Sequence, residues 1–180
     1  MKAIIASDIH GNIPYTKSLE ELILRENPDK LILLGDIFGV GDNQELIELL
    51  NKYEDIIYAC QGNCDPSYFQ EQTKFNYTRD YFTTNLDDTK FFCTHGHLLY
   101  KKELIEASKD MYVLSGHTHV YMIHGKYKNP GSVGRPRENP EHTCLLYKNK
   151  TFYLIDLFDL KIIDSCPLTE TKNTIKLKKI

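Results

Sequence analysis

Seven side chains that can bind metal ions follow short apolar segments at five places along this 180-residue chain. They are Asp8, His10, Asp36, Asn63, His95, His117 and His119. Asp8 and His10 form a pair with one residue between them, as do His117 and His119. Residues two apart on an extended backbone point to the same side, so both members of each pair can point toward one site. Carboxylate, amide and imidazole ligands suit divalent transition metals and would support hydrolytic chemistry.

The segments before the first of these residues predict a sheet that brings them together. Apolar runs predict strands over 2–6, 30–34 and 56–60, and helical spacing of apolar residues predicts helices over 15–26 and 44–53. Strands that alternate with helices pair in parallel through crossovers. Because the carboxyl ends of parallel strands meet in one crevice, we expect the candidate ligands to lie close together.

The second half of the chain is richer in predicted strands. They cover 76–83, 90–94, 111–114, 121–127, 142–147, 151–156 and 161–165. One helix is predicted over 101–109, and the turn at 148–150 indicates a hairpin. No linker, repeat or low-complexity segment divides the chain. We therefore expect a single domain over 1–180 with its core over 1–166, and the tail over 171–180 is either an edge strand or a frayed end.

A glycine lies beside each group of candidate ligands. These are Gly11, Gly35, Gly62, Gly96 and Gly116. Glycine adopts backbone conformations that other residues avoid, so these positions are expected to let the chain turn sharply at the site.

Each candidate ligand also has a simpler interpretation. An aspartate after a strand is commonly a turn or cap residue, and a histidine is commonly a solvated or packed side chain. The set as a whole is harder to explain this way. Five of the seven histidines lie in pairs or in turns that follow predicted strands, namely His10, His95, His97, His117 and His119. This joint pattern favours one shared site.

Composition limits the remaining choices. The net charge of −3 argues against a general nucleic-acid-binding protein. Five cysteines, an odd number, indicate free thiols in a reducing compartment, and no second cysteine pair completes a zinc cage with Cys60 and Cys64. No apolar run is long enough for a signal peptide or a membrane span, so we expect a cytoplasmic protein that does not bind membranes.

The motifs resemble those of the calcineurin-like metallophosphoesterases, and within them the small YfcE-type phosphodiesterase group. The similar segments are 8–12, 35–36, 62–65, 94–97 and 116–119, followed by Asn-Pro-Gly-Ser-Val at 129–133. The resemblance spans about residues 1–166. It implies an α/β fold, a four-layer α/β/β/α sandwich of two mixed β-sheets with flanking helices.

The resemblance also implies two metal ions. One would bind Asp8, His10, Asp36 and His119. The other would bind Asp36, Asn63, His95 and His117. We expect two divalent transition metal ions, with manganese as the first choice and nickel, iron, cobalt or zinc as alternatives. Two such ions lower the pKa of a bridging water, and the resulting hydroxide attacks the phosphodiester. Asp36, Asn63, His95 and His97 are the expected catalytic residues.

One residue departs from the pattern of many relatives. They have a histidine directly after the third-motif asparagine, where this chain has Cys64. A thiol replaces an imidazolium poorly, and a phosphodiester with an acidic leaving group needs less help from a general acid. His97 could serve instead. Asn12, Cys64 and Arg135 are predicted substrate contacts, although a loop arginine such as Arg135 or Arg137 is more commonly solvated.

The sequence therefore predicts a metal-dependent phosphodiesterase, a phosphoric ester hydrolase acting on a small phosphodiester. Two alternatives stay open. One is a non-catalytic interaction scaffold like a retromer subunit of the same fold. The other is a phosphomonoesterase or nucleotide hydrolase that uses the same site, because loops determine the pocket. A homodimer or homotetramer is also expected from the resemblance.

Overall fold

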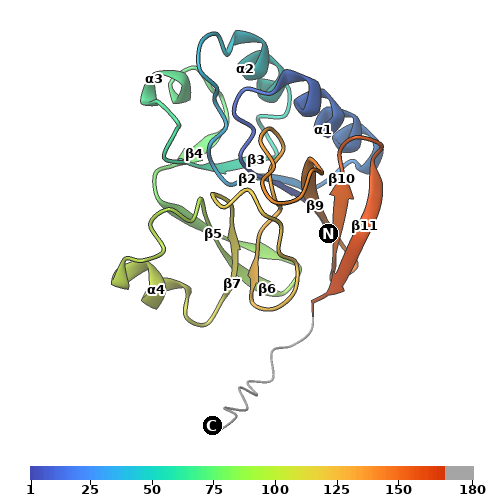
Figure 1. Ribbon diagram of the computed structural model, residues 1–180. Helices are drawn as coiled ribbons and strands as arrows, with labels where there is room; N and C mark the ends of the chain where they lie inside the picture. The colour runs from blue at the N-terminus through green and yellow to red at the C-terminus, as the bar shows by residue number, and fades with distance from the viewer. Residues whose placement is uncertain (169–180) are drawn as a thin grey trace, which may run out of the picture.

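Two β-sheets pack face to face, with helices on their outer sides, in the computed structural model, which describes residues 1–168 (Figure 1). The larger sheet has seven strands in the order β11-β10-β9-β1-β2-β3-β4. Its parallel half consists of β1 (Lys2–Ala6), β2 (Lys30–Leu33), β3 (Ile57–Cys60) and β4 (Asn76–Thr78). Its antiparallel half consists of β9 (Thr143–Lys148), β10 (Thr151–Asp156) and β11 (Lys161–Pro167).

The smaller sheet has four strands in the order β5-β6-β7-β8. These are β5 (Tyr81–Leu86), β6 (Thr89–Thr94), β7 (Tyr112–Ser115) and β8 (Tyr127–Lys128). The first pair is antiparallel, whereas β6, β7 and β8 run parallel. Both sheets are therefore mixed.

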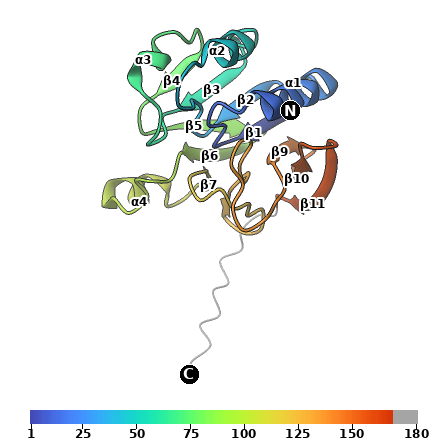
Figure 2. The same cartoon turned by 45° about the horizontal axis from the view of Figure 1, so that its top comes forward.

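The helices cover the outer faces of the two sheets (Figure 2). Helices α1 (Ile13–Glu26) and α2 (Gln44–Asn51) contribute buried leucines to a core with one face of the larger sheet. Helix α4 (Lys102–Ser108) packs Leu104 against Phe92 and Val113 of the smaller sheet.

Strand β1 shows how the sequence produces these layers. Ile4 and Ala6 belong to the core beneath the helices, whereas Ala3 and Ile5 belong to the core between the two sheets. Successive side chains of a strand point to opposite faces, so a strand that is apolar at every position is buried on both sides. The predicted four-layer α/β/β/α sandwich is confirmed.

Two predicted strands are wrong. Residues 76–83 do not form one strand, because the chain leaves the larger sheet after Thr78 and enters the smaller sheet at Tyr81. Residues 121–127 form no continuous strand either. Only a single bridge pairs Met122 with Asn129, and the chain turns at Gly125 with a φ of 83°. The structure also contains a short helix that the sequence did not predict, α3 (Ser67–Gln70).

The hairpin at 148–150 is confirmed. Thr151 pairs with Lys148 across a turn in which Asn149 and Lys150 have φ values of 52° and 54°. Positive φ at both central residues is typical of the two-residue turn that matches the twist of paired strands. The tail over 171–180 lies outside the described residues. Within the described part of the chain, no helix is long and apolar enough to cross a membrane.

Candidate metal centre

The candidate ligands follow strands of both sheets. Asp8 follows β1, Asp36 follows β2 and Asn63 follows β3 of the larger sheet, whereas His95 follows β6 and His117 follows β7 of the smaller one. Because β1, β2 and β3 run parallel, as do β6 and β7, their carboxyl ends lie at the same end of each sheet. The predicted convergence of strand ends is therefore present.

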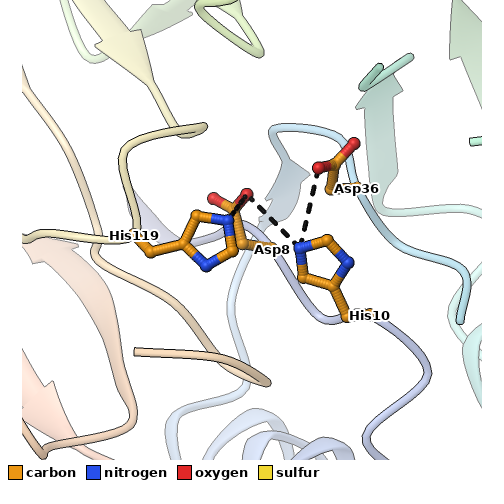
Figure 3. Close-up of side chains that lie close together, drawn as sticks. All are labelled: Asp8, His10, Asp36 and His119. Carbon is orange, nitrogen blue, oxygen red and sulfur yellow. Dashed lines mark ion pairs between the residues drawn. The ribbon is translucent and has the colours of Figure 1, made fainter. Parts of the chain in front are cut away.

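Four of these side chains form a tight group. Ligand atoms of Asp8, His10, Asp36 and His119 all lie within 4.8 Å of one another. Figure 3 shows one oxygen of Asp8 facing a nitrogen of each imidazole ring, and one oxygen of Asp36 facing the ring of His10. The Nε2 atom of His119 lies 3.3 Å from Oδ1 of Asp8, and that of His10 lies 3.6 Å from Oδ2 of Asp36.

A second group lies on the other side of Asp36. The Nε2 atom of His95 is 3.5 Å from Oδ2 of Asp36 and 3.1 Å from Oδ1 of Asn63. The ring of His117 stands edge-on to that of His95, with 5.1 Å between their centroids. Asp36 is the member that the two groups share, and its side chain is almost fully buried.

Five of the seven candidate ligands have a left-handed backbone. These are Asp8, His10, Asp36, His117 and His119, with φ between 49° and 71°. Residues with a Cβ adopt this conformation at a cost of about 1–2 kcal/mol. Such strain persists where surrounding contacts enforce it, and it concentrates at functional sites. Five of the eleven described non-glycine residues with positive φ are thus candidate ligands.

The neighbouring glycines act in two ways. Gly11, Gly35 and Gly96 have positive φ, as expected. Gly62 and Gly116 are not among the residues with positive φ, so the interpretation that they relieve a turn is wrong for them. They permit close approach instead, because a Cβ at Gly62 would overlap the backbone and carboxylate of Asp36, and one at Gly116 would overlap Ser7.

Backbone carbonyl groups orient two of the imidazole rings. His95 donates Nδ1–H to the carbonyl oxygen of Leu34 over 2.7 Å, and His119 donates Nδ1–H to that of Arg135 over 2.5 Å. Each hydrogen bond fixes the neutral ring in the tautomer whose Nε2 atom carries a lone pair. A hydrogen bond of this kind commonly orients a histidine that binds a metal ion.

The atoms at the centre of the first group lack hydrogen-bond partners. Oδ1 of Asp8 and Nε2 of His10 are buried and make no hydrogen bond among the described residues. Burying acceptors without a donor costs free energy unless a cation lies between them. The converging lone pairs, with their oxygen and nitrogen chemistry, fit divalent metal ions.

The protonation states agree with this fit. Burial lowers the pKa of His10 to about 4, so its ring is neutral at pH 7. Burial alone would raise the pKa of Asp36, but the hydrogen bond and charge of His95 outweigh it and hold that carboxyl well below its usual range. The same contacts raise the pKa of His95 against its own burial.

A cavity of about 290 Å³ opens onto this centre. It is lined by His10, Asp36, Asn63, Cys64, His117, His119, Arg135, Pro136 and Arg137. The predicted substrate contacts Cys64 and Arg135 thus face the cavity. Its size suits a small ester rather than a polymer.

Four predicted site residues do not line this cavity: Asp8 and His95, which belong to the candidate metal centre, and Asn12 and His97. Asn12 caps helix α1, because its Oδ1 accepts from the backbone N–H of Tyr15 while its amide donates to the carbonyl oxygen of Gly134. The ring centroid of His97 lies 5.3 Å from that of His95 and 6.1 Å from that of His117. Its Nδ1 atom is buried and has no hydrogen-bond partner among the described residues.

The structure adds one residue that the sequence did not single out, Asp65, and places Arg137 at the cavity. Asp65 joins the two loops that carry Asp36 and Asn63, since its carboxylate accepts from the backbone N–H groups of Ile37 and Gly62. Arg137, considered more commonly solvated from the sequence, lines the cavity. The only feature of the sequence that could have indicated a role for Asp65 was its position inside the segment 62–65.

Comparison with known proteins agrees with this geometry. The family model described as the calcineurin-like phosphoesterase superfamily domain matches residues 1–151. The chain belongs to this superfamily. The phosphodiesterase YfcE of Escherichia coli strain K12 is 30% identical over 176 residues, covering 91% of this chain and 96% of YfcE. The solved structure of YfcE matches with a TM-score of 0.83 over 94% of this chain and 100% of that one.

One further relative is similar in sequence, and one further solved structure is similar in fold. The phosphodiesterase MJ0936 of Methanocaldococcus jannaschii is 32% identical, covering 66% of this chain and 74% of MJ0936. Vacuolar Protein Sorting 29 of Cryptosporidium parvum shares the fold with a TM-score of 0.63, at 19% identity, over 92% of this chain and 95% of that one. The predicted family and the predicted class, a phosphoric ester hydrolase, are confirmed.

Proposed function

We propose that this chain is a dinuclear-metal-dependent phosphodiesterase that hydrolyses a small phosphodiester. The observation that carries the proposal is the convergence of candidate ligands from both sheets on Asp36, together with the buried Oδ1 of Asp8 and Nε2 of His10, which make no hydrogen bond among the described residues. Asp8, His10, Asp36 and His119 would hold one ion. Asp36, Asn63, His95 and His117 would hold the other.

Asp36 is the bridging ligand in this proposal. Its Oδ2 atom lies 3.6 Å from Nε2 of His10 and 3.5 Å from Nε2 of His95, so one oxygen faces both groups. Its Oδ1 atom accepts from the backbone N–H of Cys64 over 2.8 Å, which fixes the rotation of the carboxylate. When bound, two divalent cations hold the phosphoryl oxygens, lower the pKa of a water shared between them and neutralise charge in the transition state.

The cavity favours a diester with a good leaving group. Cys64 occupies the wall where many relatives carry a histidine, and burial raises the pKa of its thiol, so it stays protonated and uncharged. A neutral thiol stabilises a departing anion less than an imidazolium does. An acidic leaving group such as an aryl oxide needs little such help. The names of the two phosphodiesterase relatives support the same substrate class.

Metal-reconstituted hydrolysis of a small substrate panel tests the proposal. The panel contains bis-(4-nitrophenyl) phosphate, 4-nitrophenyl phosphate, a cyclic nucleotide and a dinucleotide polyphosphate, each with the metal-free protein and with manganese or nickel. We expect the aryl diester to be the best substrate. Asp36→Asn should lower its kcat/KM by at least about a thousandfold, whereas Asp88→Asn, the same change at a side chain that is 95% exposed, should not.

The alternatives predict different outcomes. A preference for 4-nitrophenyl phosphate would replace the diesterase with a phosphomonoesterase, and a preference for a nucleotide would indicate a nucleotide hydrolase. No turnover of any substrate by folded protein with manganese or nickel would favour the retromer-subunit-like scaffold. A cytoplasmic location and a homodimer or homotetramer stay predictions.

A further inference from the structure

Two arginines stand at the mouth of the cavity without a carboxylate partner. Arg135 and Arg137 both line it, and among residues 1–168 neither guanidinium group makes an ion pair or a hydrogen bond. Both side chains are exposed. Arginine forms forked, charge-assisted hydrogen bonds with phosphate oxygens, so a pair of unpaired arginines beside a phosphoesterase centre requires a chemical explanation.

The backbone beneath these arginines is held by the metal centre itself. The carbonyl oxygen of Arg135 accepts from the ring of His119, and the N–H of Arg137 donates to the backbone carbonyl of His119 over 3.2 Å. The N–H of Arg135 donates to Ser132, whose hydroxyl donates to the carbonyl oxygen of Asp8 over 2.8 Å. The loop is therefore fixed to two candidate ligands, and the arginine side chains extend from a rigid base.

The residue between them keeps both side chains on one side. Pro136 disfavours helical backbone at Arg135 and favours an extended conformation there. Residues two apart on extended backbone point the same way, in agreement with the position of both side chains on the cavity wall. The two charges are also spread across the site. That of Arg135 acts on His10 and Cys64, and that of Arg137 acts on His117.

Charge balance then indicates what the arginines bind. The carboxylates of Asp8 and Asp36 would be more than neutralised by two divalent cations. A phosphodiester with one negative charge would not supply enough negative charge to balance the two guanidinium groups in addition to the metal ions. A substrate with an additional phosphate group would supply the missing negative charge, and the rigid base would place the guanidinium groups to receive it.

We propose that Arg135 and Arg137 form a subsite for a second phosphate group of the substrate, next to the phosphodiester that is cleaved. This inference rests on the proposed function. It narrows the substrate class to esters that carry a phosphate in addition to the scissile phosphodiester. The arginines act as specificity-determining residues, so their contribution lies in binding of the second phosphate rather than in the chemical step.

A matched pair of substrates tests this subsite. Thymidine 5′-(4-nitrophenyl phosphate) and its 3′-phosphorylated form release the same chromophore and differ by one phosphate. With the manganese-loaded protein, we expect kcat/KM to be at least about tenfold higher for the phosphorylated ester, mainly through a lower KM. The KM of the phosphorylated ester should rise more steeply with ionic strength than the KM of the other ester. In Arg135→Gln/Arg137→Gln this preference should fall to near unity, whereas Arg137→Lys should keep part of it.

A change of equal charge elsewhere serves as the control. Lys150→Gln removes an exposed positive charge in the β9–β10 turn, at a residue that does not line the cavity, and should keep the full preference. Equal loss on both esters in the double variant would overturn the proposal, because it would place the arginines on the scissile phosphate. No preference in the unaltered protein would overturn it as well.

Failure of the proposed function would be distinguishable from failure of the subsite. If neither ester is hydrolysed, the phosphodiesterase assignment is wrong. The subsite is then judged by calorimetry of the two intact esters with the metal-loaded protein. Binding that is at least about tenfold tighter for the phosphorylated ester, and that is lost in the double variant, supports it, and equal binding overturns it.

Discussion

The ring of His95 donates its Nδ1 proton to the backbone carbonyl of Leu34 over 2.7 Å. Leu34 belongs to the turn that presents Asp36, so one candidate ligand is oriented by the segment that carries another. The bond crosses from the smaller sheet to the larger one. The two halves of the centre are thus mutually positioned before any ion binds, which reduces the reorganisation that metal binding requires.

His95→Asn separates orientation from metal binding. An asparagine amide can reproduce the Nδ1–H donor toward Leu34 but has no atom at the Nε2 position. We expect metal content to fall from two ions to one per chain, with a loss of about 1–2 kcal/mol in the free energy of unfolding from the lost volume. Elemental analysis and urea unfolding measure both quantities.

His95→Ala is the companion variant. It also leaves the Leu34 carbonyl without a donor, which should cost about 1 kcal/mol more than His95→Asn. Retention of two tightly bound ions in either variant would remove His95 from the centre.

Gly62→Ala should damage the centre through steric overlap. The added Cβ would lie 2.9 Å from Cα of Asp36 and closer still to its backbone nitrogen and carboxylate. Since rigid backbone has to move, we expect a loss of about 3 kcal/mol or more and weaker metal binding. Gly125→Ala is the matched control. Its φ of 83° is strained for alanine but the surrounding space is open, so it should cost about 1 kcal/mol and leave metal binding unchanged.

Asp65→Asn should loosen both ligand loops of the larger sheet. One carboxylate oxygen accepts from the N–H groups of Ile37 and Phe38, and the other accepts from Gly62 N–H and the Tyr77 hydroxyl. An amide places an NH₂ group against one of these donor pairs. We expect a loss of about 2 kcal/mol and metal affinity lower by about tenfold to a hundredfold, measured by unfolding and by metal titration.

Tyr77→Phe removes only one neutral donor to the same carboxylate. It should cost about 1 kcal/mol and leave metal affinity unchanged. If Asp65→Asn weakened metal binding no more than Tyr77→Phe, the carboxylate would be a packing element and not a support for the ligand loops.

Periodicity revealed the layers but not where the chain changes sheet. The strand over 2–6 was predictable because every residue from Ala3 to Ala6 is apolar, as burial on both faces demands. The strand over 76–83 was not, because strand-favouring residues lie on both sides of Arg79 and Asp80, where the backbone passes from one sheet to the other. A local pattern carries no information about which neighbour a strand pairs with.

Residue types and order predicted which candidate ligands lie close together better than they predicted what supports them. The candidate ligands fall at strand ends, which is a property of the sequence. Their left-handed backbones leave no mark in the sequence, since Asp8, His10 and Asp36 have a Cβ and gain this conformation only from tertiary contacts. The same holds for Asp65 and for the loop that carries Arg135, whose roles depend on residues far away along the chain.

The stability of the metal-free protein should depend on pH through His10. Its pKa is about 4 in the folded chain against an ordinary value of 6.5, because burial disfavours the charged ring. Between these values the unfolded chain binds a proton that the folded chain does not. The free energy of unfolding should therefore decrease as the pH falls from about 6.5 toward 4, and this contribution is fully present only above that window.

The difference between the unaltered protein and His10→Asn isolates this effect from other titrating groups. Urea unfolding with a chelator at several pH values gives the difference, which should shrink steadily as the pH falls through the window because asparagine does not titrate. The pKa of His95 is raised, but His95 is present in both proteins, so its contribution to the pH dependence largely cancels in the difference. A difference that stays constant between pH 6.5 and 4 would mean that the ring of His10 takes up its proton as readily in the folded chain as in the unfolded one. Burial would then not disfavour the charged ring.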